Sequence, residues 1–109
     1  MSNEAAAQVF DALGDSTRRA IIESLAEGPM PVGKLADRLP VGRPNVSKHL
    51  KVLQAAKLVE HRTIGTRNLY ALAPGGLAVV QQWLIQHWDG ALNAFAAHVH
   101  QRNEGDPTS

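Results

Sequence analysis

One stretch of this sequence combines an apolar helical repeat with side chains that form hydrogen bonds and ion pairs. It runs from Arg43 to Leu53, and Val46, Leu50 and Leu53 recur at the spacing of one helix face. The opposite face carries Asn45, Ser47, Lys48 and Lys51, and Arg43 lies at its N-terminal end. Arginine and asparagine contact base edges through paired hydrogen bonds, serine bonds to bases or phosphates, and lysine neutralises phosphate. These side chains favour a helix that lies in a DNA major groove, and a surface helix with a solvated polar face is the alternative.

Positive charge is concentrated around this stretch. The whole chain has a formal net charge of only +1. Residues 40–70 hold six Lys or Arg and one acid, Glu60, which is a net charge of +5, whereas residues 1–39 and residues 71–109 each have −2. This distribution favours a polyanionic partner that is bound by one segment of the chain. A solvated basic segment without a partner is the alternative.

The composition excludes several other classes of protein. A chain of 109 residues, 44% of them hydrophobic, has the size of one domain with a small core. The absence of cysteine excludes disulfides, thiolate metal sites and cysteine nucleophiles. No apolar run approaches the roughly 20 residues of a membrane span and no signal peptide is visible, so we expect a cytoplasmic protein. The five histidines have no acid or nucleophile at a spacing that forms a catalytic site, so we do not expect an enzyme.

The elements before this stretch have to hold it in place. Helical patterns cover residues 4–13, 16–27 and 32–39, with Asp15 as the expected N-cap of the second helix. A tight connection, Pro40–Gly42, then leads into the basic helix. Two short helices joined by a brief turn are the layout of a helix-turn-helix, although many other helical hairpins share it.

A strand pattern follows the basic helix. The helical repeat of apolar residues is lost over residues 58–72, Gly65 lies where a hairpin turn falls, and Arg62 and Arg67 flank that turn. A hairpin with basic residues near its tip, directly after a helix-turn-helix, is a wing that reaches phosphates or a minor groove. A hairpin that only caps the core is the alternative.

A long last helix is expected over residues 77–101, after a loop at Ala73–Gly76. Its apolar stripe consists of Leu77, Val80, Leu84, Trp88, Leu92, Phe95 and Val99. At 1.5 Å per residue this helix is about 37 Å long, which is longer than so small a core can cover. We therefore expect a second copy of the chain to bury the surplus apolar face, and Gly90 to kink the helix. Residues 1–101 form the predicted domain, and 102–109 are expected to be a disordered polar tail.

Five short motifs occur together along the chain. They are Phe10–Arg19, Val46–Leu53, Leu58–Val59, Gly65–Arg67 and Tyr70–Leu72. Over about residues 5–100 they resemble the signature of the ArsR-type bacterial transcriptional repressors. The resemblance implies a mainly α winged helix-turn-helix with a small β-hairpin, in the order α-α-α-α-β-β-α. It also implies a homodimer, paired through the first and last helices, that binds a pseudo-palindromic operator in double-stranded DNA.

The resemblance also suggests a role for individual residues. Those expected at the dimer interface are Val9, Phe10, Leu84, Trp88, Leu92 and Phe95. Those expected to read bases are Arg43, Asn45, Ser47 and Lys48. Those expected at phosphates or in the minor groove are Lys51, Arg62 and Arg67. His49 is expected either to contact DNA or to pack against the domain.

Many members of this family sense metals, so the corresponding positions matter. A thiolate site before the recognition helix would fall within Gly33–Leu39, which contains no cysteine. On the last helix, His87 and His98 have the family's spacing, but Ile85 and Gln101 replace the other two ligands. His87 and His98 are about 16 Å apart along one helix, so only two antiparallel copies can bring them together. Two imidazoles fall short of the four ligands of a typical zinc site, so we expect no metal or cofactor.

Two alternative functions stay open. One is a winged-helix protein-interaction module without DNA binding, and the other is a metal-responsive repressor that uses His87 and His98 across the dimer. The sequence does not identify an effector, which is either a small molecule or a partner protein if one exists.

Overall fold

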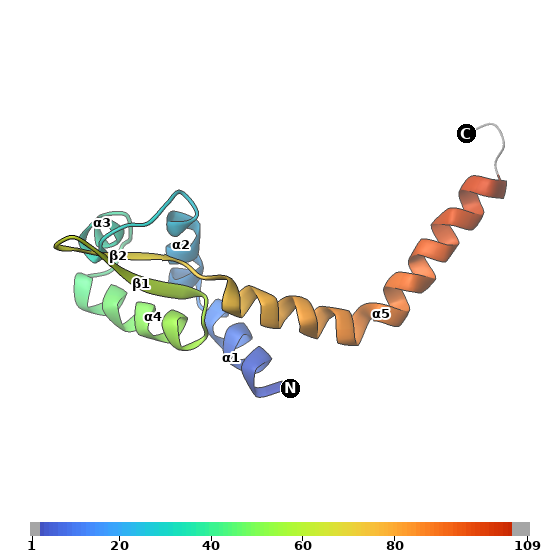
Figure 1. Cartoon of the computed structure of the whole chain (residues 1–109), viewed down its shortest axis with the longest axis horizontal. Helices are drawn as coiled ribbons and strands as arrows, with labels where there is room; N and C mark the ends of the chain where they lie inside the picture. Colours follow the sequence, from blue (N-terminus) through green and yellow to red (C-terminus); the bar gives the residue numbers. More distant parts are fainter. Residues whose placement is uncertain (1–2, 106–109) are drawn as a thin grey trace.

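The computed structural model describes the backbone of residues 3–105 and the side chains of residues 4–91, 93 and 94 (Figure 1). Its elements are α1 (Asn3–Leu13), α2 (Ser16–Leu25), α3 (Val32–Asp37), α4 (Arg43–Ala55), β1 (Val59–Ile64), β2 (Arg67–Leu72) and α5 (Pro74–Gly105). This order confirms the predicted mainly helical fold with one β-hairpin. Figure 1 shows α1 to α4 and the hairpin gathered at one end, with α5 projecting from them.

The apolar face predicted for α4 lies in the middle of the core. Val46, Leu50 and Leu53 are each at most 1% exposed, and they share one buried cluster with Ile21 of α2 and Leu35 of α3. Among the described residues, no polar or charged side chain is buried. The core therefore holds α4 by its apolar face and leaves its polar side chains at the surface.

The hairpin is fastened to the body at its base. β1 and β2 pair antiparallel with Val59 opposite Leu72, and Gly65 turns the chain with a φ of 64°. Met30, between α2 and α3, exchanges two backbone hydrogen bonds with Tyr70 of β2, at 2.9 and 2.8 Å. The base of the hairpin is thus fixed, whereas the residues around its turn are exposed.

Two helices end earlier than predicted from the sequence. α2 ends at Leu25 and α3 at Asp37, each two residues before its expected end. In both cases the last turn tightens, because backbone N–H groups bond three residues back: Gly28 to Leu25 O at 3.0 Å and Arg38 to Leu35 O at 3.1 Å.

The start of α5 contradicts the predicted loop over Ala73–Gly76, because the helix already begins at Pro74. Proline fits the first turn of a helix, where its missing N–H has no partner to lose. Gly76 is buried there, and a Cβ at this position would lie 2.7 Å from the backbone oxygen of Ala56. This glycine therefore allows a close approach between α5 and the end of α4 and does not interrupt the helix.

α5 extends well beyond the body of the protein. The radius of gyration is 19.1 Å, against about 13 Å for a compact domain of this size. The helix continues to Gly105, so residues 102–105 are helical and not part of a disordered tail as predicted, while 106–109 lie outside the described residues. Residues 102–105 contain no proline, so nothing in their sequence prevents the helix from continuing.

Figure 1 shows α5 as two straight parts joined by a bend. Bends in helices have local causes, and the assignment of this one to Gly90 stays a prediction. No helix within residues 3–105 combines the length and the hydropathy that crossing a lipid bilayer requires.

The end of α4 carries a strained residue. Leu58 N–H bonds to Leu53 O and Lys57 N–H bonds to Gln54 O, both at 3.0 Å, which is the Schellman arrangement. This arrangement needs a left-handed residue, and Lys57 occupies the position with a φ of 62°. Glycine is the usual residue there because it has no Cβ.

Lys57→Gly is therefore expected to stabilise the fold by about 0.5–1 kcal/mol. The left-handed conformation costs a residue with a Cβ roughly 1–2 kcal/mol, and the greater freedom of glycine in the unfolded chain offsets about half of that gain. Urea unfolding at a fixed protein concentration measures the difference. Lys57→Ala is the control, because it removes the same charge but keeps the strain, and a gain of equal size in both variants would contradict this explanation.

Candidate nucleic-acid interface

The outward face of α4 presents the side chains that the sequence assigned to DNA. Asn45, Lys48 and Lys51 are exposed, and Ser47 is half-buried at the flank of this face. Val52, which is 40% exposed, is the apolar member of the same surface. Because the core holds the opposite face of α4, these side chains stand on a rigid support.

Arg43, at the start of α4, is exposed but leans on α3. A Cβ at Gly33 would lie 2.7 Å from Nη2 of Arg43, so the guanidinium rests over the one residue type that leaves room for it. Arg43 therefore links the two helices of the helix-turn-helix.

His49 faces the body of the protein. The ring is half-buried, and its Nδ1 lies 3.3 Å from Nη1 of Arg18 in α2. Arginine can only donate, so Nδ1 is the acceptor in this contact. Of the two placements that the sequence left open for His49, the structure favours packing against the domain.

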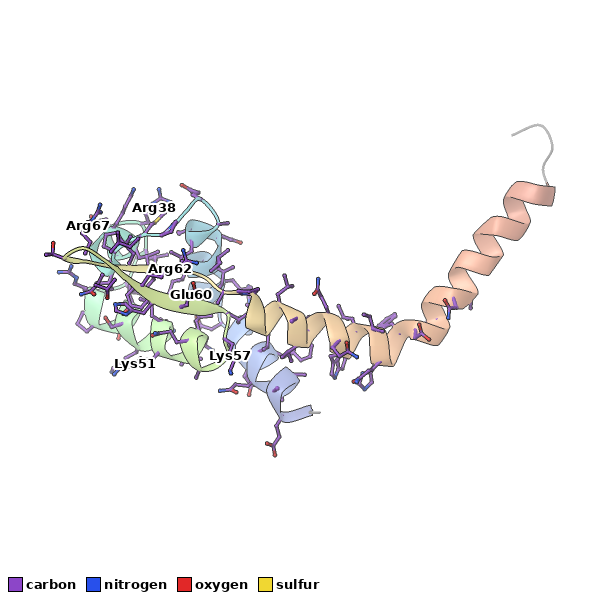
Figure 2. The ribbon with its side chains drawn as sticks, viewed as in Figure 1. Arg38, Lys51, Lys57, Glu60, Arg62 and Arg67 are labelled. Carbon is purple, nitrogen blue, oxygen red and sulfur yellow. The ribbon has the colours of Figure 1, made fainter. Side chains whose placement is uncertain are left out.

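The hairpin arginines differ in their surroundings. The guanidinium of Arg62 donates through Nε to Glu60 Oε2 at 2.6 Å, and both side chains project from β1 (Figure 2). Arg67, in β2, is exposed near the turn. The sequence reasoning counted Glu60 only as an acid and missed its pairing with Arg62, although residues two apart on a strand share one face.

Some cations of the described residues form ion pairs with carboxylates and others do not. Arg38 pairs with Glu27 at 3.0 Å, and this hydrogen bond holds the pKa of Glu27 below its ordinary value. Within the described part of the chain, Lys48, Lys51 and Arg67 have no such partner within 4.0 Å. Figure 2 shows Lys51 and Arg67 at the end of the molecule opposite the projecting part of α5. These three cations are exposed and available to a polyanion, and in the described residues the same holds for Lys34, Arg43 and Lys57.

The candidate dimer residues fall into three groups. Phe10, Leu84 and Trp88 are 40%, 43% and 52% exposed, so they present apolar surface on α1 and α5. Val9 is only 1% exposed because it packs in the core of its own protomer, which corrects its assignment to the interface. The side chains of Leu92 and Phe95 lie outside the described residues.

The histidine positions on α5 are only partly described. The ring of His87 stacks on Trp83 with centroids 4.3 Å apart, and its Nδ1 donates to Trp83 O at 2.9 Å. The side chain of His98 lies outside the described residues. Where side chains are described, no three His, Cys, Asp or Glu residues gather as metal ligands would.

The sequence matches known proteins over most of its length. Residues 2–62 match the model of a family described as a helix-turn-helix domain. The chain is also 50% identical over 101 residues to the HTH-type transcriptional regulator Rv2034 of Mycobacterium tuberculosis. This match covers 93% of the present chain and 92% of the relative.

Two solved structures resemble this fold. An ArsR-like transcriptional regulator from Rhodococcus sp. RHA1 has a TM-score of 0.72 and 36% identity, over 84% of this chain and 90% of its own. A homodimeric winged helix-turn-helix DNA-binding domain from Mycobacterium bovis, described as a possible ArsR-family transcriptional regulator, has a TM-score of 0.62 and 27% identity. That similarity covers 94% of this chain and 93% of the other.

Proposed function

Because the chain belongs to the ArsR family of winged helix-turn-helix transcriptional regulators, we propose that it binds a pseudo-palindromic operator as a homodimer and represses transcription there. The observation that carries this proposal is that α4 has one buried apolar face and one exposed polar face. Val46, Leu50 and Leu53 fix the helix in the core, and the opposite face offers Asn45 and Lys48 to a partner. A helix held in this way fits the major groove of B-DNA.

The side chains divide by the chemistry that each offers. Asn45 can bond to adenine through both ends of its amide, and Lys48, Ser47 and Arg43 also reach base edges when α4 lies in the groove. Lys51 and Arg67 neutralise phosphate beside the groove. Arg62 joins them if it exchanges Glu60 for phosphate, an exchange at the surface that costs little because exposed ion pairs are weak.

The apolar surface of α1 and α5 supports the proposed dimer. Phe10, Leu84 and Trp88 are exposed in the protomer, and the related domain from Mycobacterium bovis is homodimeric. A twofold axis places two copies of α4 about one helical turn of DNA apart, roughly 34 Å, which matches a pseudo-palindromic operator. A dimer seated across a promoter excludes RNA polymerase, which is the proposed route to repression.

Two substitutions on α4 test this assignment. Asn45→Ala is expected to cost about 1–3 kcal/mol of binding free energy, mainly at one base position, because the amide reads a base edge.

Lys48→Ala is expected to weaken binding to all sequences. It is also expected to lower by about one the slope of the logarithm of the binding constant against the logarithm of the salt concentration, because its ammonium also releases counterions.

The measurement is a gel shift on a duplex that the protein itself selects from a random pool, compared with a scrambled duplex at two salt concentrations. Equal losses on both duplexes for Asn45→Ala would contradict its role in base reading. Binding that does not change with salt would instead favour a protein-interaction module, since phosphate contacts depend steeply on salt.

A further inference from the structure

The side chain of Arg18 connects three helices. It lies in the first turn of α2, and its Nε and Nη2 donate to Ala12 O at 2.6 Å and Asp11 O at 3.0 Å, in the last turn of α1. Its Nη1 donates to Nδ1 of His49 in α4, at 3.3 Å. The backbone N–H of Arg18 donates to Asp15 Oδ1, which holds the pKa of Asp15 below its ordinary value and fixes the start of α2.

These bonds give Arg18 a fixed orientation. The last carbonyls of a helix have no partners within it, and Arg18 supplies two of them with donors. The guanidinium is planar, so two bonds to α1 also determine where the third donor points. That third donor holds His49, and it therefore relates the position of α4 to that of α1.

His49 stands next to the face that is proposed to read DNA. Asn45 precedes it by four residues and Val52 follows it by three, so all three side chains lie near one another along α4. A contact at His49 consequently adds to the core packing of α4 in restraining how the helix is rotated about its own axis. This rotation decides the direction in which Asn45 and Lys48 project.

At its other end Arg18 contacts α1, which is one of the two helices proposed to form the dimer interface. α1 packs on α5, and the rings of Phe10 and Trp83 meet edge to face with centroids 5.0 Å apart. A palindromic operator requires both recognition helices at a fixed spacing and rotation. The helices that would set the spacing, α1 and α5, are thus tied to the helix that would read the bases through Arg18 and His49.

We propose that Arg18 is a positioning residue for DNA recognition, which holds His49 and thereby refines the rotation of α4 relative to α1 beyond what the core packing of α4 sets. This inference rests on the proposed function. Arg18 itself contacts no DNA in this proposal, so its loss reduces discrimination between operator and other DNA more than it reduces affinity for DNA in general.

The neighbouring residue provides a matched control. Arg19 is also in the first turn of α2, and its Nη1 donates to Leu13 O at 2.7 Å, in the same last turn of α1. The described contacts of Arg19 do not include α4. Arg19→Gln therefore removes the same charge and one hydrogen bond to the last turn of α1, while it leaves the contact with His49 in place.

The first experiment compares Arg18→Gln with Arg19→Gln by fluorescence anisotropy on the selected operator and on a scrambled duplex. Arg18→Gln is expected to weaken operator binding by about tenfold more than Arg19→Gln, with similar small losses for both on the scrambled duplex. Equal operator affinities for the two variants would overturn the proposal. If the wild-type protein bound neither duplex, the proposed function itself would fail, which is a different result.

The second experiment varies His49 and does not depend on the folding of Arg18→Gln. His49→Asn keeps an acceptor near the position of Nδ1 but removes Nε2, and His49→Leu removes both. We expect His49→Asn to bind operator within about twofold of wild type and His49→Leu to lose about tenfold. A loss in His49→Asn as large as that in His49→Leu would show that Nε2 acts on DNA, and would overturn the proposal.

The two sites also have to act as one unit. Arg18→Gln combined with His49→Leu is expected to weaken operator binding no more than either substitution alone, because both remove the same contact. Losses that multiply in the double variant would contradict the coupling. Circular dichroism and sedimentation confirm that each variant is folded and has the oligomeric state of the wild type.

Discussion

Trp88→Glu is expected to make the protein monomeric and to lower operator affinity by about a hundredfold or more. The indole is 52% exposed on α5, next to the 43% exposed Leu84, so a charge there would have to be buried in the dimer without a partner. Two linked recognition helices bind far more tightly than one, because the second binds at a high effective concentration. A monomer keeps its contacts with one half-site and loses this gain.

Sedimentation equilibrium and gel shifts on full and half operators measure the two effects separately. Gln86→Glu is the matched control, because it adds the same charge to an exposed position of α5 two residues away, which is on a different face. It is expected to stay dimeric and to bind normally. A Trp88→Glu protein that is monomeric and still binds the full operator as tightly as the wild type would contradict the bivalent mechanism.

Local patterns in the sequence were sufficient to predict the elements that form the site. The spacing of Val46, Leu50 and Leu53 predicts both the helix and its buried face, since a helix repeats every 3.6 residues wherever it packs. Gly65 at the hairpin turn and Asp15 as N-cap are likewise set by neighbours a few residues away. These features depend on short-range geometry, which a single sequence contains.

Features that depend on contacts between distant segments were not predictable in this way. Pro74 and Gly76 look like helix breakers in the sequence, but the backbone of Ala56, which is remote along the chain, makes Gly76 a packing residue. Val9 has the apolar character of an interface residue and is in fact core. The spacing of 31 residues between Arg18 and His49 gives no sequence signal of their contact.

The long last helix, α5, has one feature that the sequence predicts and one that it does not. The length of its apolar stripe predicts more hydrophobic surface than one small domain can bury, and the structure places Leu84 and Trp88 outside the core. The sequence does not reveal how a second copy would cover this surface, because that depends on the geometry of two protomers. The dimer of this chain therefore stays a prediction, and its contacts have to be tested residue by residue.

Leu50→Ala is expected to lower the free energy of unfolding by about 2–5 kcal/mol. Leu50 is 1% exposed and lies in the central cluster, so truncation removes buried methyl groups and leaves a cavity that close packing cannot easily fill. This loss is a large share of the roughly 5–15 kcal/mol that holds a typical domain folded. Since the same leucine supports the polar face of α4, the proposed DNA recognition would depend directly on this packing.

Urea unfolding at one protein concentration measures the loss, because the stability of a dimer depends on concentration. Val52→Ala is the control on the same helix: its side chain is 40% exposed, so we expect a change within about 0.5 kcal/mol. A gel shift of the same two variants, run well below the unfolding temperature, compares the effect on DNA binding of losing core packing under α4 with that of losing a surface side chain. A Leu50→Ala protein as stable as Val52→Ala would mean that α4 is not held by its apolar face, and the rigid presentation of Asn45 and Lys48 would lose its physical basis.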